Sequence, residues 1–138
     1  MGADAVLNPA EPDFLGRLRK AAGAEGVDVS VEMSGNPKGI ELALKSVRNG
    51  GRFTAFGLPG ARLELDYAND IVFKGIKIYG IAGLEIFRSW YKMESLLKSK
   101  AIDIRPVITH VFAMKDHKKA FETMTDKEKK CGKIILVP

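Results

Sequence analysis

Apolar positions along the chain repeat with two spacings, and the two spacings alternate from one segment to the next. Short runs that suit strands lie at residues 27–33, 52–57, 76–83, 107–112 and 133–138, and residues 4–8 form a short extended piece. Apolar residues three and four positions apart predict helices at residues 14–23, from Pro37 to the stretch 48–51, at residues 85–100 and at residues 115–124. Alternating strands and helices are typical of parallel β–α units, so the pattern predicts an α/β fold.

The ends and apolar faces of these helices follow from the same pattern. We expect Asp13 to cap the first helix and Asn36 to cap the second, in which Pro37 takes the first helical position. Gly23 would stop the first helix. The residues expected on buried helix faces are Phe14, Leu15, Leu18, Ala22, Ile40, Leu42, Ala43, Leu44, Val47, Ile86, Trp90, Met93, Leu96, Leu97, Ala120, Phe121 and Met124.

The composition narrows the class of protein. With 138 residues, of which 46% are hydrophobic and 28% charged, the chain fits one folded domain better than a disordered segment. Cys131 is the only cysteine, which excludes an internal disulfide and fits the reducing cytosol. No apolar run approaches the roughly 20 residues that span a bilayer, and the first residues do not resemble a secretory leader. We therefore expect a cytoplasmic protein with no membrane partner.

The net charge of +5 raises the question of a nucleic-acid partner. Lysines gather near the end of the chain, at Lys115, Lys118, Lys119, Lys127, Lys129, Lys130 and Lys133. Acidic residues are mixed among them, and no aromatic side chains lie between them to stack on bases. A solvated helix face explains this pattern better, and we expect no nucleic-acid partner.

Three of the predicted strands end in glycine. Gly35 follows the first, Gly57 the second, and Gly80 with Gly83 the third. Missing side chains at the carboxyl ends of parallel strands let a flat ligand approach the backbone, which favours a cofactor groove. Each glycine taken alone is better explained by a tight turn, and it is the three equivalent places together that favour a groove.

Residue types that carry catalysis are sparse. His110, His117 and Cys131 are the only imidazoles and the only thiol, too few and too scattered for a zinc site. Ser34 lacks the first glycine of a nucleophile elbow. Glu32 is either a tuned acid or base or, as we favour, a structural carboxylate. There is no G-x-G-x-x-G and no Walker motif, so the sequence predicts no catalytic residue and no metal site.

Five stretches, taken in order, carry a resemblance to a known family. They read "GVDVSVEMSGNP", "NGGRFTAFGLPG", "FKGIKIYGIAGLEIFRSWYKMESLLKS", "IRPVITHVF" and "AFETM…CGKIILV". They resemble the last two-fifths of medium-chain zinc-dependent alcohol dehydrogenases, and within these the threonine dehydrogenase branch. The resemblance implies that residues 1–83 are part of an NAD-binding domain, the second half of a Rossmann-type parallel sheet. It implies that residues 84–138 are a C-terminal segment that returns to the catalytic domain.

The resemblance also implies where NAD would lie. The implied cofactor-binding residues are Ser34, Gly35, Phe56, Gly57, Leu58, Ile81 and Ala82. Ser34 and Gly35, after the first strand, would flank the adenosine side. Phe56, Gly57 and Leu58, after the second strand, match the turn beside the nicotinamide ribose. Ile81 and Ala82 match the backbone that contacts the nicotinamide carboxamide. All of them would supply backbone groups and apolar contacts, not acid or base chemistry.

Full members of the family also carry a domain with the zinc ligands and the proton relay, and a first nucleotide half with the glycine fingerprint. This sequence contains neither, so the resemblance implies an NAD-dependent oxidoreductase fragment that is inactive alone and binds NAD weakly or not at all. Zinc belongs to the parent family, and no ligands for it are expected here. One departure from the family is Leu84, where members usually carry arginine. The alternative is a non-catalytic remnant that serves as a binding or assembly module.

Two strand edges predict self-association. The strand from Gly75 to Gly80 is, by resemblance, the one that meets its twin across a two-fold axis. The edge from Asp28 to Met33 would lack the neighbour that it has in the family, and unpaired edges recruit partners. We expect at least a dimer through one of these edges, or a separate N-terminal half that completes the sheet.

Overall fold

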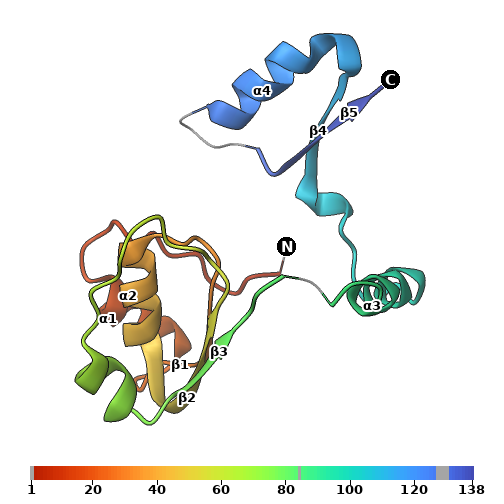
Figure 1. Cartoon of the computed structure of the whole chain (residues 1–138). Helices are drawn as coiled ribbons and strands as arrows, with labels where there is room; N and C mark the ends of the chain where they lie inside the picture. Colours follow the sequence, from red (N-terminus) through yellow and green to blue (C-terminus); the bar gives the residue numbers. More distant parts are fainter. Residues whose placement is uncertain (1, 84, 127–130) are drawn as a thin grey trace. The chain divides into compact units, whose positions relative to one another are not determined.

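The computed structural model describes residues 2–83, 85–126 and 131–138. The chain forms two compact units, the first from Gly2 to Gly83 and the second from there to Pro138 (Figure 1). The assignment of the first unit to an NAD-binding domain and of the second to a catalytic domain stays a prediction. Leu84, where the sequence departs from the family, lies outside the described residues, as do residues 127–130 of the last loop.

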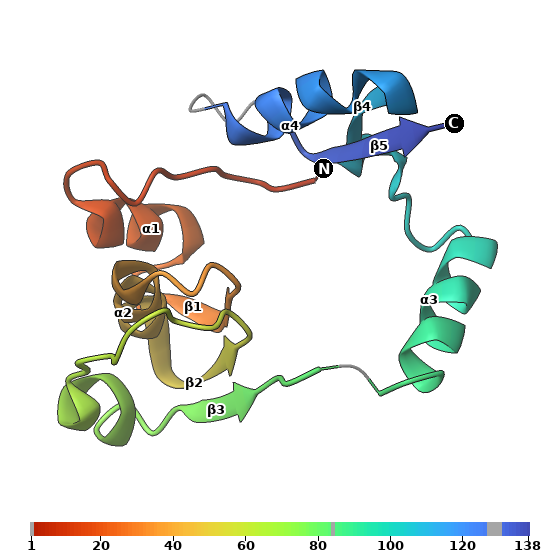
Figure 2. The ribbon, with the colours of Figure 1, turned by 45° about the horizontal axis from the view of Figure 1, so that its top comes forward.

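The first unit is a parallel sheet with two helices and confirms the predicted α/β class. Its strands are β1 (Val27–Glu32), β2 (Val47–Ala55) and β3 (Lys77–Gly80), in that spatial order. The helices are α1 (Phe14–Ala22) and α2 (Pro37–Ser46), and a π-helical turn (Ala68–Val72) precedes β3. Figure 2 shows α2 beside β1 and β2. Within the described residues, β1 and β3 are both edge strands.

The two predicted helix caps differ in outcome. Asn36 caps α2 as expected, because its side-chain oxygen accepts from the N–H groups of Lys38 at 2.9 Å and Gly39 at 3.2 Å. Asp13 makes no side-chain cap, so that prediction is wrong. Its backbone is left-handed, with φ of 53°, whereas a side-chain cap requires an extended residue. Only its carbonyl oxygen starts α1, accepting from Arg17 N at 3.0 Å.

The predicted end of the second helix is also wrong. The helix ends at Ser46, and the stretch 48–51 lies inside β2. Val47 is already extended, with ψ of 132°, and is 1% exposed in the core. The pairing of β1 with β2 is irregular there, because Val27 is opposite Val47 while Val29 is opposite Arg52. The glycines that were expected to end the helix therefore form a bulge in a strand.

The core of the first unit lies between α2 and one face of the sheet. It is formed by Ile40, Leu44, Val47 and Phe53, which are 1–6% exposed. The opposite face is open within the described residues: Val31 is 57% exposed and Tyr79 is 48% exposed. The sheet is therefore packed on one side by this unit's own helices.

The second unit holds a helix and a two-stranded parallel sheet with a helix against it. Its elements are α3 (Arg88–Lys98), a 3₁₀ turn (Arg105–Val107), β4 (Ile108–Ala113), a 3₁₀ turn (Met114–Asp116), α4 (His117–Thr125) and β5 (Lys133–Val137). β4 pairs with β5, and α4 packs on both. The strands and helices predicted in this half are confirmed, although α3 begins three residues later than expected. Phe87, with φ of 69°, prevents an earlier start.

The buried helix faces predicted for this unit are mostly wrong. On α4, Ala120 is buried as expected, whereas Phe121 and Met124 are more than half exposed. Around α3, Leu96 is half-buried, but the other expected residues are exposed, with Trp90 at 59%. A sheet of two strands offers too little apolar surface to cover every amphipathic face. In the first unit, Ala22 is likewise exposed, and Leu42 and Ala43 are half-buried.

Candidate functional site

The ends of β1, β2 and β3 lie at one edge of the sheet. The N–H groups of Phe56 and Gly57 both donate to Glu32 O at 3.0 Å, which joins the end of β2 to the end of β1. Ile81 N donates to Ala55 O at 2.9 Å, which joins the end of β3 to that of β2. The residues implied by the family resemblance are therefore brought together at the carboxyl edge, where ligands bind in parallel sheets. We name this place the strand-end site.

Glu32 organises the first turn of the strand-end site. Its carboxylate is the last side chain of β1 and is 5% exposed. It accepts hydrogen bonds from Ser34 N at 2.8 Å, from Ser34 Oγ at 2.5 Å and from Gly35 N at 3.1 Å. Burial alone would raise the pKa of Glu32, but the hydrogen bonds from Ser34 and Gly35 outweigh it and hold this pKa below its ordinary value of 4.5.

This geometry decides between the two interpretations of Glu32. A general base needs a free lone pair near the substrate and a pKa close to the working pH. The Glu32 carboxylate instead satisfies the backbone of its own turn, and its pKa moves away from neutrality. The structural interpretation is therefore supported, and Glu32 fixes the loop that carries Ser34 and Gly35.

Two of the strand-end glycines are required by close packing. Gly35 has φ of 67°, and a Cβ there would lie 2.4 Å from Leu58 O. A Cβ on Gly57 would lie 2.2 Å from Gly35 N. Gly80 and Gly83 differ, because a Cβ on either would meet nothing within 4 Å. Close packing therefore explains the first pair, and the positive φ of Gly83, 68°, fits a turn, whereas Gly80 simply leaves open space at the end of β3.

The strand-end site offers apolar surface more than hydrogen-bond donors. Phe56 is 47% exposed, Leu58 is 90% exposed and Ile81 is 46% exposed, while Ala82 is also exposed. The N–H groups of Ser34, Gly35, Phe56, Gly57 and Ile81 all donate within the chain. The site thus offers exposed apolar side chains, and these five donors do not remain to orient a ligand.

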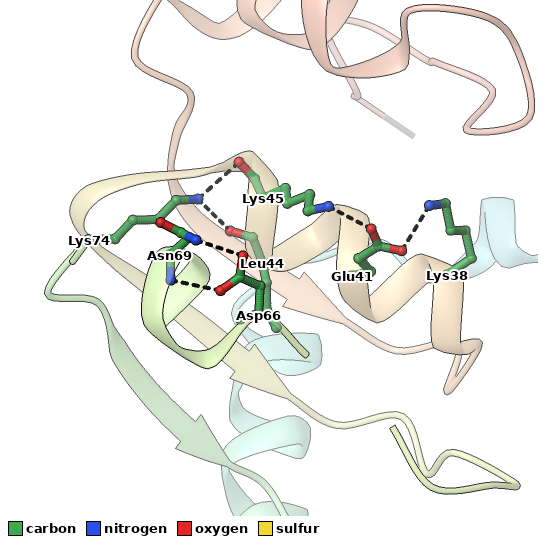
Figure 3. Close-up of polar contacts among 7 residues, drawn as sticks. All are labelled: Lys38, Glu41, Leu44, Lys45, Asp66, Asn69 and Lys74. Carbon is green, nitrogen blue, oxygen red and sulfur yellow. Dashed lines mark hydrogen bonds and ion pairs between the residues drawn. The ribbon is translucent and has the colours of Figure 1, made fainter. Parts of the chain in front are cut away.

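A cluster of polar contacts, shown in Figure 3, holds the start of β3 and was missed from the sequence. Lys74 Nζ donates to three carbonyl oxygens at the end of α2 and beyond, those of Leu44, Lys45 and Val47, at 2.9, 3.1 and 3.0 Å. Lys74 O accepts from Gly50 N at 2.7 Å. Burial lowers the pKa of Lys74 below its ordinary value. Lys74 therefore ties β3 to α2 and β2, which fixes the strand that ends at Ile81.

Charged side chains on α2 complete the view in Figure 3. Glu41 pairs with Lys38 at 2.8 Å and with Lys45 at 2.6 Å, and these hydrogen bonds lower the pKa of Glu41 to about 2. Asp66 accepts from the side-chain nitrogen of Asn69 at 2.7 Å. These contacts lie on the surface, and such pairs stabilise a helix only slightly. They carry no chemistry of their own.

Metal-binding side chains do not gather in the described part of the chain, where no three His, Cys, Asp or Glu residues form a possible site. His110 Nδ1 lies 2.9 Å from Thr109 Oγ1, and its ring stacks on Phe112 with the ring centroids 6.0 Å apart. His117 Nδ1 lies 3.2 Å from Met114 O. Both imidazoles thus have structural contacts, and the residues present do not fit a zinc centre.

No helix among the described residues has the length and apolar character needed to cross a membrane.

Comparison with known proteins confirms the family resemblance. Residues 1–99 match the zinc-binding dehydrogenase family. L-threonine 3-dehydrogenase from Bacillus licheniformis is 41% identical over 138 residues, which cover 100% of this chain and 39% of that protein. The enzyme of the same name from Vibrio cholerae is 40% identical over 136 residues, covering 99% of this chain and 38% of the relative. The chain thus spans about two-fifths of the curated relatives it matches.

Solved structures show the same fold. The 2R,3R-butanediol dehydrogenase from Bacillus subtilis superposes with a TM-score of 0.76 at 24% identity, over 94% of this chain and 36% of that chain. Zinc-dependent alcohol dehydrogenase 2 from Streptococcus pneumonia superposes with a TM-score of 0.83 at 23% identity, over 98% of this chain and 39% of the other. At these identities the likeness is one of fold.

Proposed function

The chain belongs to the zinc-binding dehydrogenase family, and on that premise we propose that it forms one wall of the NAD groove of an oxidoreductase resembling L-threonine 3-dehydrogenase. The observation that carries the proposal is the strand-end site. Three parallel strands end side by side there, with Phe56, Leu58 and Ile81 exposed around them. Open apolar surface at the carboxyl ends of parallel strands suits a nucleotide cofactor.

Each part of the site has a proposed role. NAD, when bound, supplies the acceptor for a hydride from a secondary alcohol such as that of L-threonine. The turn of Phe56, Gly57 and Leu58 would pack against the nicotinamide ribose. The backbone of Ile81 and Ala82 would lie beside the carboxamide and position the ring. The residues after β1, Ser34 and Gly35, would line the adenosine side through carbonyl and apolar contacts, because their N–H groups are bound to Glu32.

These 138 residues alone are proposed to be inactive. They are proposed to supply no acid, base or metal ligand, because the carboxylate at the site is bound to its own turn and the imidazoles have structural contacts. The activity of the family would therefore require residues outside this sequence. We expect the purified chain to show no reduction of NAD above a buffer blank with zinc and L-threonine. Turnover that survives repeated purification contradicts this.

Weak cofactor affinity follows from the same geometry. Exposed apolar side chains are present, but five of the seven backbone N–H groups of the site, which could orient a nucleotide, already donate within the chain. The dissociation constant for NAD should be larger than about 1 mM, equivalent to under about 4 kcal/mol of binding free energy. Titration calorimetry measures it, and a micromolar dissociation constant would show that the chain orients NAD through polar groups other than these backbone donors.

Self-association is a second part of the proposal. Both edge strands of the first unit expose apolar side chains within the described structure, Val31 on β1 at 57% and Tyr79 on β3 at 48%. We propose at least a dimer, through β3 and its approach from Gly75 or through the edge of β1. A separate N-terminal half pairing with β1 would be an alternative partner for that edge.

Two variants separate these edges. Ile78 also lies on β3, but its side chain lines an apolar cavity of about 230 Å³. Its substitution would therefore change the packing of the first unit as well as the strand edge. Tyr79→Lys places a charge on β3, and Val29→Lys, at a residue that is 41% exposed, does the same on β1, so each is the control for the other. Light scattering on a size-exclusion column should show that only one variant becomes a monomer. A parent chain that is monomeric at micromolar concentration refutes the dimer.

The second candidate function is a non-catalytic binding or assembly module. The observation that favours it is α3, where Trp90 is 59% exposed and Met93 is 49% exposed, so the helix presents apolar surface. Absence of any NAD binding at tens of millimolar, together with a stable oligomer, would favour this function over the first.

A further inference from the structure

The amino end of the sheet, opposite the strand-end site, holds a polar cavity that the proposed function does not use. Its volume is about 450 Å³. The lining residues are Asp28, Arg48, Gly50, Gly51, Arg52 and Lys77. All of them belong to the first unit, so the cavity is formed by one compact body.

A bulge in β2 creates this cavity. Between the pair Val27–Val47 and the pair Val29–Arg52, β1 advances by two residues while β2 advances by five. Gly50, within the bulge, has φ of 70°, which favours glycine. Bulges of this kind commonly redirect side chains beside binding sites. Here Arg48, Gly50 and Gly51, which belong to the extra residues, all line the cavity.

The charge of the cavity is unbalanced. Three cationic side chains line it against a single carboxylate, Asp28, and that carboxylate accepts from Arg48 Nε at 2.7 Å. Arg48 Nη1 donates to Asn49 O at 2.8 Å, so the guanidinium is held at both of these atoms. Within the described residues its Nη2 N–H groups have no protein acceptor, and they remain available for a ligand.

Arg52 and Lys77 provide the other two charges. They are partners in the register of β2 and β3, so their side chains leave the same face of the sheet from neighbouring strands. Like charges on residues directly opposite each other on neighbouring strands repel. Among the residues that the structure describes, neither cation has an ion-pair partner. An anion between them would remove this repulsion and bind both.

We propose that Arg48, Arg52 and Lys77 form a binding site for a dianionic phosphate group at the amino end of the sheet. Guanidinium groups match phosphate oxygens with paired N–H donors, and a lysine ammonium adds a point charge. The phosphate comes either free or at the end of a nucleotide. The site lies at the opposite end of the strands from the proposed NAD wall and does not depend on it.

Nuclear magnetic resonance titrations of the full chain test the site, with inorganic phosphate, AMP and adenosine as separate probes at constant ionic strength. Inorganic phosphate should shift the backbone amides of Gly50, Gly51, Arg52 and Lys77. Equal shifts with inorganic phosphate and AMP indicate a site for the free group, and stronger shifts with AMP indicate a nucleotide. Adenosine should leave these amides unmoved.

Paired variants with the same change in charge complete the test. The double variant Arg52→Gln and Lys77→Gln should weaken phosphate binding at least about tenfold, since each removes a charge-assisted contact. The control pair, Arg62→Gln with Lys20→Gln, lowers the net charge equally at exposed positions away from the cavity and should leave binding within about twofold. Circular dichroism confirms that both fold.

Three results would overturn the proposal. Shifts spread over every lysine and arginine would mean non-specific screening. An equal loss of phosphate binding in the control pair, Arg62→Gln with Lys20→Gln, would also mean non-specific screening. If the double variant changes the oligomeric state but not the phosphate affinity, then Arg52 and Lys77 bind an acidic surface of another chain instead of phosphate.

Discussion

The substitution Gly57→Ala tests whether the turns after β1 and β2 are pressed together. Gly57 follows β2, and Gly35 lies in the turn after β1, where Glu32 holds it. A Cβ on Gly57 would lie 2.2 Å from Gly35 N and 2.8 Å from Gly35 Cα. It would also lie 2.6 Å from Glu32 Oε2. Because two of these atoms are backbone, a side-chain rotation cannot relieve the clash, and the two turns must separate.

The size of the effect follows from the two contacts that change. Overpacking of this kind costs about 1–3 kcal/mol. Separation of the turns also stretches the bonds from Gly35 N to the Glu32 carboxylate, which adds about 1 kcal/mol or more. We therefore expect Gly57→Ala to lower the free energy of unfolding by at least about 2 kcal/mol. That is a large share of the stability of a small domain.

Gly80→Ala is the matched control, because Gly80 also ends a strand of the sheet and a Cβ there meets nothing within 4 Å. It should change the free energy of unfolding by no more than about 0.5 kcal/mol. Urea titrations followed by far-ultraviolet circular dichroism measure both values. Equal losses in the two variants, or a loss below about 0.5 kcal/mol for Gly57→Ala, would refute the close approach of the turns.

Two further substitutions test other contacts of the first unit. The folded pKa of Glu32 lies below its ordinary value of 4.5, so its contribution to stability is complete above that pH and is lost as pH falls through the folded pKa. With Glu32→Gln, the free energy of unfolding should fall less steeply as the pH is lowered. Glu25→Gln, at an exposed position, should leave the pH dependence of the free energy of unfolding as it is in the parent chain. Lys74→Met removes the donor to two carbonyl oxygens at the end of α2 and one at the start of β2, and it should cost about 1–3 kcal/mol in urea titrations. Lys20→Met is its exposed control, and an equal cost in both lysine variants would contradict the anchoring role of Lys74.

The positions of the strands and the start of α2 could be predicted from the sequence because they depend on local pattern. The alternation around Val29 and Val31 and the pair Asn36–Pro37 each act within a few residues. The stretch 48–51 was misassigned because its two glycines suit a loop, and only pairing with β1 reveals a bulge. The role of Lys74 depends on carbonyl oxygens 27 to 30 residues away, which no local pattern contains.

The candidate site was predictable in its place but not in its chemistry. Parallel strands bring their carboxyl ends together, so the gathering of residues such as Gly35 and Phe56 follows from the fold class. The capture of Ser34 and Gly35 by the Glu32 carboxylate depends on a side-chain direction that the sequence does not fix. Helix faces around Trp90 were expected to be buried because amphipathic spacing implies a partner surface, and the second unit does not supply one.

The central claim is that the strand-end site forms a wall for NAD, and amide chemical shifts during an NAD titration test it most directly. Tens of millimolar NAD should shift Phe56, Gly57, Leu58, Ile81 and Ala82, with no saturation below about 1 mM. Nicotinamide mononucleotide should shift the same amides, whereas AMP should leave Ile81 and Ala82 unmoved. If NAD shifts other amides but not these five, or shifts no amide of the chain, the assignment of this edge to the cofactor is wrong.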